Sequence, residues 1–270
     1  MDRVVTGLDH PEEDEAAIAL MGLASPFLKP FLPAHFKQID DLTKAEMRDP
    51  ILRATWKSKW LNFLKSVQLA QPETILVLKS PAHANRLPLI LDLFPDAKFI
   101  HITRDPVDTV LSNLHMEDSL HAAYGFEASN LTQTDRVKQT LVGFSHYHKK
   151  LFHDLHLIPD TQYHRLRYED LQNDPAKELG NVFRFLEGPQ TSLPKEVRRY
   201  LSEGGKPYAP RTHETVPELR ALIEKRTHAY SNRFAYVRPA PPDTTYDFKA
   251  DCLGSGSRTT GDKTHVSPRI

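Results

Sequence analysis

The sequence is poor in the features that mark a membrane or nucleic-acid-binding protein. Its 270 residues include one cysteine, Cys252, so no disulfide can form within the chain. Lysine and arginine number 35, as do aspartate and glutamate, so there is no overall positive field for a nucleic acid or an anionic membrane. The longest apolar run, residues 16–24, is too short to span a bilayer. We therefore expect no nucleic-acid partner and no membrane, and any anion site must be local.

Glycine is scarce in the first half of the chain, where only Gly7 and Gly22 precede residue 120. A Walker-type phosphate loop, G-x-x-x-x-G-K-[ST], does not occur, which argues against a nucleotide kinase. The amino end also lacks the basic stretch that opens a signal peptide. We therefore expect a cytoplasmic protein.

Composition divides the chain into two parts. Residues 239–270 are rich in Pro, Gly, Ser and Thr and offer little apolar surface, so we predict a disordered tail. Residues 1–238 read as one unit. Within this unit, residues 74–79 and 98–104 are apolar runs rich in β-branched side chains, and residues 162–169 form a more polar run. We predict that all three runs are strands.

Helical patterns alternate with these strands. Residues 49–70, 132–157 and 174–186 place apolar side chains on one face, and the first and third of these segments begin with Asp-Pro. Trp56 and Trp60 share the apolar face of the first segment, so we interpret them as core residues. Strands that alternate with helices indicate an α/β fold with a parallel sheet.

A basic residue, Arg104, closes the second predicted strand. It precedes Asp105 and Pro106, a pair typical of a helix start, where unpaired N–H groups and the helix dipole favour an anion. Ser112 lies two turns along the predicted helix and can offer a hydroxyl. These residues predict a phosphate site. The alternative is that Arg104 pairs with Asp105 or Asp108 and that Ser112 is solvated.

The preceding strand repeats this design. Lys79 closes the strand, and Ser80 and Pro81 begin a helix that carries His83. Ligands of α/β folds bind beyond the carboxyl ends of the strands, where both cations are expected to lie. We therefore predict that Lys79 and Arg104 meet in one anion pocket, although a chance pair is the alternative.

Four segments form an ordered set of motifs. They are LDHPEEDEAAIALMGLASPF (8–27), LVLKSPAH…FPDAKFIHITRDPVDTVLS (76–112), RYEDLQNDP (167–175) and RTHAYSNRFAY (226–236). This set resembles the sulfotransferase family that uses 3′-phosphoadenosine 5′-phosphosulfate (PAPS), in particular its bacterial branch with the KSPxH and RDP…Ser patterns. The resemblance covers essentially residues 8–238. It implies a three-layer α/β fold of the P-loop-NTPase-like sulfotransferase type, with a mostly parallel central sheet flanked by helices.

The resemblance also implies a reaction. A sulfonate would pass from PAPS to an acceptor hydroxyl or amine, and no metal would be required. Arg104 and Ser112 would hold the 3′-phosphate of the nucleotide, while Lys79 would face the sulfonate and stabilise charge on the leaving phosphate. A small molecule, a carbohydrate or a peptide side chain would fit as the acceptor, and the oligomeric state is not predicted.

The resemblance leaves the general base open. His83 is similar to the histidine base of the family's cytosolic branch but stands two positions later, and an ordinary surface histidine is the alternative. Other branches use a glutamate, for which Glu13 and Glu15 are the candidates. Residues 12–15 are all acidic, however, and the simpler interpretation is a solvated face that complements a helix dipole.

One family element has no counterpart in the sequence. The family binds the 5′-phosphosulfate with a strand, loop and helix near its amino end, in a pattern like PRSGTT, which does not occur here. We therefore expect the chain to begin inside the family's domain and the fold to be incomplete there. Three interpretations follow: a truncated or mis-started enzyme, a non-catalytic nucleotide-binding or assembly module, and a half completed by another chain.

Two further segments carry charged side chains. Glu169 follows the third predicted strand, and we interpret it as a structural partner of Arg165 or Arg167. Residues 226–233 would close over the nucleotide, an expectation that depends on family position alone.

Fourteen histidines raise the question of a metal site. His146, His148, His153 and His156 lie in one predicted helix, but the helical period directs the first two to different sides. No carboxylate or cysteine set accompanies His153 and His156, so we predict no metal site.

Overall fold

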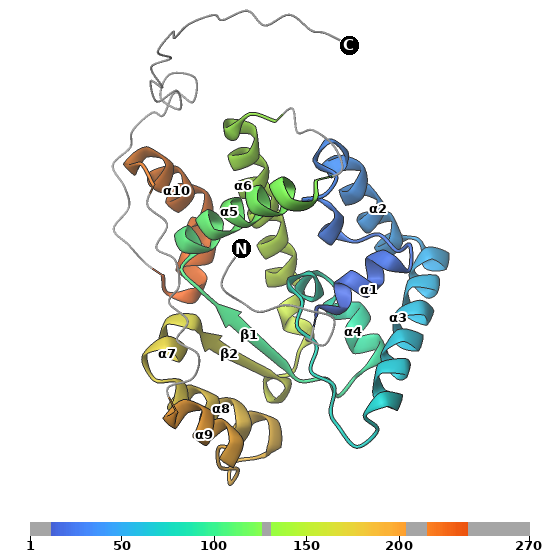
Figure 1. The fold of residues 1–270 in the computed structure, drawn as a ribbon, viewed down its shortest axis with the longest axis vertical. Helices are drawn as coiled ribbons and strands as arrows, with labels where there is room; N and C mark the ends of the chain where they lie inside the picture. Colours follow the sequence, from blue (N-terminus) through green and yellow to red (C-terminus); the bar gives the residue numbers. More distant parts are fainter. Residues whose placement is uncertain (1–11, 126–130, 204–214, 237–270) are drawn as a thin grey trace, which may run out of the picture.

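The computed structural model describes residues 12–125, 131–203 and 215–236 (Figure 1). The tail predicted at 239–270 lies outside the described residues. None of the described helices combines the length and the apolar character needed to cross a bilayer. The α-helices are α1 (Asp14–Leu20), α2 (Phe36–Arg48), α3 (Pro50–Ala70), α4 (Leu87–Leu93), α5 (Pro106–Tyr124), α6 (Gln133–Asp154), α7 (Tyr168–Asn173), α8 (Pro175–Glu187), α9 (Lys195–Ser202) and α10 (Pro217–Phe234).

Short 3₁₀ turns connect several of these helices. They are η1 (Pro26–Leu28), η2 (Pro33–His35), η3 (Pro81–Asn85), η4 (Leu155–Leu157) and η5 (Asp160–Gln162). The turn η3 concerns the site, because it contains His83.

Two of the three predicted strands form, and they pair in parallel as expected. They are β1 (Phe99–Thr103) and β2 (Tyr163–Arg167), with Phe99 opposite Tyr163 and Thr103 opposite Arg167. Helices α5, α6 and α10 pack together beyond one side of this sheet, and α7 and α8 pack against β2 (Figure 1). The carboxyl end of β1 therefore leads into a corner between α5, α7 and α10.

The prediction of a third strand at 74–79 is wrong, and the described part of the chain has a two-stranded sheet in place of the larger central sheet that the resemblance implies. Residues 75–80 run without regular structure, and the side chains of Ile75 and Val77 are 90% and 84% exposed. Alternating apolar residues suit a strand, but a strand forms only beside a partner backbone. No backbone hydrogen bond joins residues 75–79 to another described segment. The described fold is mostly helical, with a two-stranded parallel sheet.

Three Asp-Pro pairs each begin a helix, as the sequence predicts. The side chain of Asp49 accepts the N–H groups of Ile51 and Leu52 at the start of α3, at 2.8 and 2.9 Å. Asp105 and Asp174 cap α5 and α8 in the same way. An aspartate at the N-cap satisfies helix N–H groups, and proline at the first helical position loses no hydrogen bond.

The core is divided into clusters that join distant helices. Trp56 and Trp60 are fully buried, as predicted, and they pack in one cluster with Ile18 of α1 and Ile90 of α4. A second cluster joins α5, α6 and α10. Its buried members are Val107, Val110, Leu111, Val137, Leu141 and Ile223.

Candidate functional site

The acidic start of α1 meets the segment that follows Lys79. Three consecutive acidic residues each pair with one basic residue of segment 79–86. The pairs are Glu13–Lys79, Asp14–His83 and Glu15–Arg86. The motifs at 12–15 and 79–83, which are far apart in the sequence, therefore form one cluster.

Asp14 lies at the centre of this cluster. Trp60 donates its indole N–H to Asp14 at 2.7 Å, and Nε2 of His83 lies 3.0 Å from each carboxylate oxygen. Burial by itself raises the pKa of Asp14, but the hydrogen bond and charge of His83, together with the bond from Trp60, outweigh it and lower that pKa. The other ring nitrogen of His83, Nδ1, is buried and has no hydrogen-bond partner among the described residues.

Glu15 forms a buried ion pair with Arg86, and both side chains are 3% exposed. Nη2 of Arg86 donates to Glu15 at 2.9 Å, and the hydroxyl of Ser25 donates to the same carboxylate at 2.6 Å. The Arg86 guanidinium also lies 4.8 Å from the ring of Trp56. The predicted solvated acidic face is therefore wrong for Asp14 and Glu15, which are buried beside His83 and Arg86.

Glu13 and Lys79 form the exposed part of the cluster. Lys79 lies near the end of the irregular segment 75–80, and its side chain is 78% exposed against 26% for Glu13. The ammonium group contacts the Glu13 carboxylate directly. An exposed ammonium beside a carboxylate is able to exchange its partner for the anionic part of a ligand.

The turn from β1 to α5 carries Arg104. The Asp105 carboxylate accepts the N–H groups of Val107 and Asp108 at 2.8 and 3.3 Å, and Glu169 accepts the N–H of Asp105 at 2.8 Å. The expectation that unpaired N–H groups at this helix start attract an anion is therefore wrong, because carboxylates already occupy them.

The side chains of Arg104 and Ser112, unlike the backbone N–H groups of this turn, are not occupied by carboxylates of the described residues. The guanidinium of Arg104 lies 4.8 Å from the ring of Tyr168, and no described carboxylate forms an ion pair with it. The alternative of an ion pair with Asp105 or Asp108 is therefore not observed. Ser112 is half-buried on α5, and its hydroxyl makes no hydrogen bond to the described residues. Both candidate phosphate ligands are thus available for a ligand.

Two residues from elsewhere in the chain hold the Arg104 turn. The hydroxyl of Tyr230 on α10 donates to the carbonyl oxygen of Arg104 at 3.2 Å and accepts its N–H at 3.3 Å. Tyr236 donates its hydroxyl to Glu169 at 2.9 Å. Glu169 also lies 4.0 Å from Nε of Arg167, the ion pair expected from the sequence, but it mainly bonds Asp105 and Tyr236.

The structure thus forms two clusters rather than one. Glu13, Lys79 and His83 lie together, whereas Arg104 precedes α5 and Ser112 lies two turns into that helix. No hydrogen bond or ion pair between described residues joins the two groups. The meeting of Lys79 and Arg104 in one pocket stays a prediction.

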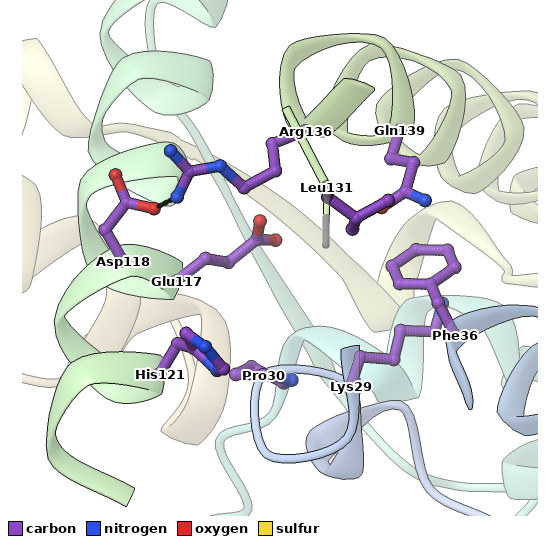
Figure 2. Close-up of a pocket in the computed structure, with 9 residues that line it drawn as sticks. All are labelled: Lys29, Pro30, Phe36, Glu117, Asp118, His121, Leu131, Arg136 and Gln139. Carbon is purple, nitrogen blue, oxygen red and sulfur yellow. Dashed lines mark ion pairs between the residues drawn. The ribbon is translucent and has the colours of Figure 1, made fainter. Parts of the chain in front are cut away.

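A small pocket lies apart from both clusters (Figure 2). It measures about 50 Å³ and is lined by residues of α5 and α6 and of the chain around α2, none of which was a candidate. Glu117 faces the pocket, and burial raises the pKa of its carboxyl group. Beside it, Arg136 pairs with Asp118. In the described part of the chain, no three His, Cys, Asp or Glu side chains are grouped to hold a metal.

Sequence reasoning missed the residues that support the candidates. Asp14 and Arg86 show nothing in the sequence beyond their charge. Each lies about 70 residues from the residue that it pairs with, and local patterns do not predict contacts over such separations. Tyr230 and Tyr236 lie in the motif RTHAYSNRFAY, but a role over the nucleotide was considered only for its arginines and histidine. A hydroxyl that bonds a backbone 126 residues away leaves no periodic trace.

Comparisons with known proteins identify relatives of the chain. The chain is 30% identical over 243 residues to omega-hydroxy-beta-dihydromenaquinone-9 sulfotransferase Stf3 of Mycobacterium bovis and, equally, of Mycobacterium tuberculosis. This match covers 89% of the chain but 61% of each relative, so the chain spans about three fifths of their length.

A solved structure shows the same fold. The crystal structure of sulfotransferase STF9 from Mycobacterium avium superposes with a TM-score of 0.66 at 18% identity, over 86% of this chain and 59% of that one. A model described as the sulfotransferase family matches residues 14–192, a range that contains Lys79, His83, Arg104 and Ser112 but not Glu13. The chain therefore belongs to the sulfotransferase family, as its ordered motifs predicted.

Proposed function

We propose that the chain supplies the acceptor-activating and 3′-phosphate-binding parts of a PAPS-dependent sulfotransferase. The observation that carries this proposal is the Glu13–Lys79 pair, an exposed ammonium next to a carboxylate at the end of a family motif. Family membership supports sulfonate transfer in general, and PAPS is the donor that the family resemblance implies. The chain spans 61% of the length of its curated relatives, so we also propose, rather than infer from them, that the chain is active by itself.

The Glu13–Lys79 pair favours Glu13 as the general base. When a donor binds, its negative charges attract Lys79, and the Glu13 carboxylate is then free to take a proton. The acceptor oxygen attacks the sulfur, and the bond from sulfur to the bridging phosphate oxygen breaks. The electron pair leaves with 3′,5′-diphosphoadenosine, where Lys79 stabilises the developing charge, and the proton passes to Glu13.

His83 fits a positioning role better than that of the base. Nε2 faces Asp14 and Nδ1 is buried, so neither ring nitrogen is presented to an acceptor. Asp14 and His83 instead fix the start of α1 against η3. This contact holds Glu13 and Lys79 in register.

The acceptor is proposed as a hydroxyl compound. The relatives are named for a hydroxylated dihydromenaquinone, which is a small lipid-like molecule with a terminal alcohol. We therefore expect transfer of ³⁵S from labelled PAPS to a prenyl alcohol rather than to a carbohydrate. Labelling of the carbohydrate alone would contradict this choice of acceptor.

The nucleotide site is tested by calorimetric titration of 3′,5′-diphosphoadenosine. Arg104→Ala and Ser112→Ala should weaken binding, the first by about tenfold or more because a charge-assisted bond is lost. Arg199→Ala on α9, whose side chain is 73% exposed, is the matched control and should bind like the wild type. Wild-type protein that does not bind the nucleotide would refute the proposal.

A second candidate is a nucleotide-binding module without chemistry. Such a module would use the same phosphate ligands, Arg104 and Ser112, and would need neither a base nor an acceptor site. Binding of 3′,5′-diphosphoadenosine without transfer of ³⁵S would decide for the module. Binding with transfer would decide for the enzyme.

A further inference from the structure

The strand-to-helix turn at Arg104 is held by side chains on both of its flanks. A residue at the end of a short strand ordinarily exposes its N–H and carbonyl groups to water, and its backbone then moves freely. Here both backbone groups of Arg104 bond the same side-chain hydroxyl, and the next N–H bonds a carboxylate.

Tyr230 contributes the hydroxyl. It lies 3.2 Å from the carbonyl oxygen of Arg104 and 3.3 Å from its nitrogen. The ring is 6% exposed and packs edge-on against Phe144 and Phe234, at centroid distances of 5.4 and 4.9 Å. The hydroxyl therefore has a fixed position that is set by the packing of α6 and α10.

Glu169 contributes the carboxylate. One oxygen accepts the N–H of Asp105 at 2.8 Å, and the other accepts the hydroxyl of Tyr236 at 2.9 Å. Tyr236 also lies 3.3 Å from the buried hydroxyl of Thr103. With both oxygens engaged, the carboxylate cannot turn away from Asp105.

The residue before Glu169 supports the side chain of the same arginine. The ring of Tyr168 lies 4.8 Å from the Arg104 guanidinium, a distance that suits a cation–π contact. The start of α7 therefore acts twice, with Tyr168 on the guanidinium and Glu169 on the backbone that follows it. A guanidinium ordered before the ligand arrives loses less entropy when it binds a phosphate.

We infer that Tyr230 and Glu169 are positioning residues that hold Arg104 in the orientation needed to bind the 3′-phosphate. The inference rests on the proposed function, because it assigns a task to residues around the proposed phosphate ligand. In this role neither residue needs to touch the nucleotide. Each acts through the backbone of the turn.

The test compares two tyrosine variants that each lose one hydroxyl. Tyr230→Phe removes the bonds to Arg104 and keeps the packed ring. Tyr163→Phe removes a hydroxyl that bonds Nδ1 of His101 at 2.7 Å, at the start of β2 and away from the turn. Both variants lose a hydrogen bond inside the fold, so their thermal midpoints serve to match them for stability.

The readout is the Kd of 3′,5′-diphosphoadenosine, measured by calorimetry. Tyr230→Phe should raise Kd by about three- to tenfold, the effect of one or two lost hydrogen bonds, whereas Tyr163→Phe should stay within about twofold. Glu169→Ala should also raise Kd, and Glu169→Gln should restore it, because glutamine keeps an oxygen for the N–H of Asp105. A purely structural role would not produce this rescue or this difference between the tyrosines.

The outcomes separate the inference from the proposed function. If the wild type binds the nucleotide and Tyr230→Phe binds equally well, the positioning role is wrong while the phosphate site stands. Equal weakening by Tyr163→Phe at matched thermal midpoints would also overturn the role. If the wild type does not bind, the proposed function fails and the inference fails with it.

Discussion

Replacement of Glu15 by leucine should destabilise the chain strongly. Glu15 and Arg86 are each 3% exposed, and the guanidinium donates to the carboxylate through two nitrogens. In the Glu15→Leu variant the Arg86 charge stays buried without its partner, and the hydroxyl of Ser25 loses its acceptor as well. Breaking a buried ion pair from one side costs about 3–5 kcal/mol, which outweighs the gain from burying an apolar side chain.

The loss is large enough to measure directly. In a chain of this size, each kcal/mol changes the thermal midpoint by about 2–4 °C, so we expect a decrease of roughly 10 °C. Urea unfolding followed by tryptophan fluorescence is a suitable assay, because the sequence has two tryptophans and the Arg86 guanidinium lies on the ring of one of them, Trp56. The unfolding midpoint should fall while the slope of the transition is unchanged.

The double variant Glu15→Leu/Arg86→Met is the control. It removes both charges, so no unpaired ion stays buried, and its loss should be less than half of the sum of the two single losses. A loss below about 1 kcal/mol for Glu15→Leu, a value typical of an exposed pair, would refute the reasoning. Strict additivity of the two single variants would refute it equally.

Three further predictions concern the same region. Lys79→Ala should keep the unfolding free energy within about 0.5 kcal/mol of the wild-type value, because the side chain is 78% exposed. The same variant should lower ³⁵S transfer by about a hundredfold, and full activity would exclude a catalytic role for Lys79. Asp14, whose folded pKa lies below its unfolded value, stabilises the fold fully above the unfolded pKa, and this contribution disappears as pH falls through the folded pKa. Urea midpoints measured from pH 6 to pH 2 should therefore fall less steeply for Asp14→Asn than for the wild type, and parallel curves would contradict this assignment. Ile75→Lys/Val77→Lys should not change the free energy of unfolding and should reduce light scattering by concentrated samples, since both side chains are almost fully exposed; a destabilised variant would show that they pack against something.

Local patterns predicted the three Asp-Pro helix starts and two strands correctly, but the helix predicted to begin at Ser80 and Pro81 is the 3₁₀ turn η3. The Asp-Pro pairs that begin α3, α5 and α8 determine their own capping, because the carboxylate and the N–H groups that it accepts are two or three residues apart. The burial of Trp56 and Trp60 followed from the helical period in the same way. These features depend on residues close together in the sequence, so local sequence patterns are enough to predict them.

The features that failed depend on partners far along the chain. Residues 74–79 have the composition of a strand, but pairing depends on a neighbouring backbone, which composition does not specify. The acidic run at 12–15 looked like a solvated face because the cations that partner it begin 66 residues later. Arg104 directly follows β1, whose last residue is Thr103, and the N–H groups expected beside it are occupied by Asp105 and Glu169.

The roles of the candidate residues stay predictions, whereas the structure now describes their surroundings. Lys79, His83 and Glu13 were named from motifs, and the structure brings all three into one cluster. The sequence did not reveal that Asp14 stands between His83 and Trp60, a contact that changes the interpretation of the histidine. Motifs indicate which residues carry the chemistry, whereas long-range packing decides how each of them can act.

The Tyr230 hydroxyl that bonds Arg104 also determines when the turn from β1 to α5 can be completed during synthesis. A ribosome that has added Arg104 must add 126 more residues before Tyr230 exists, and Glu169 appears about halfway through that interval. Contacts across such separations form slowly, since a long loop must close before they yield any stability. A nascent chain therefore carries β1 and α5 for much of its translation without the brace that orients them, and any product that stops before α10 is complete never acquires it.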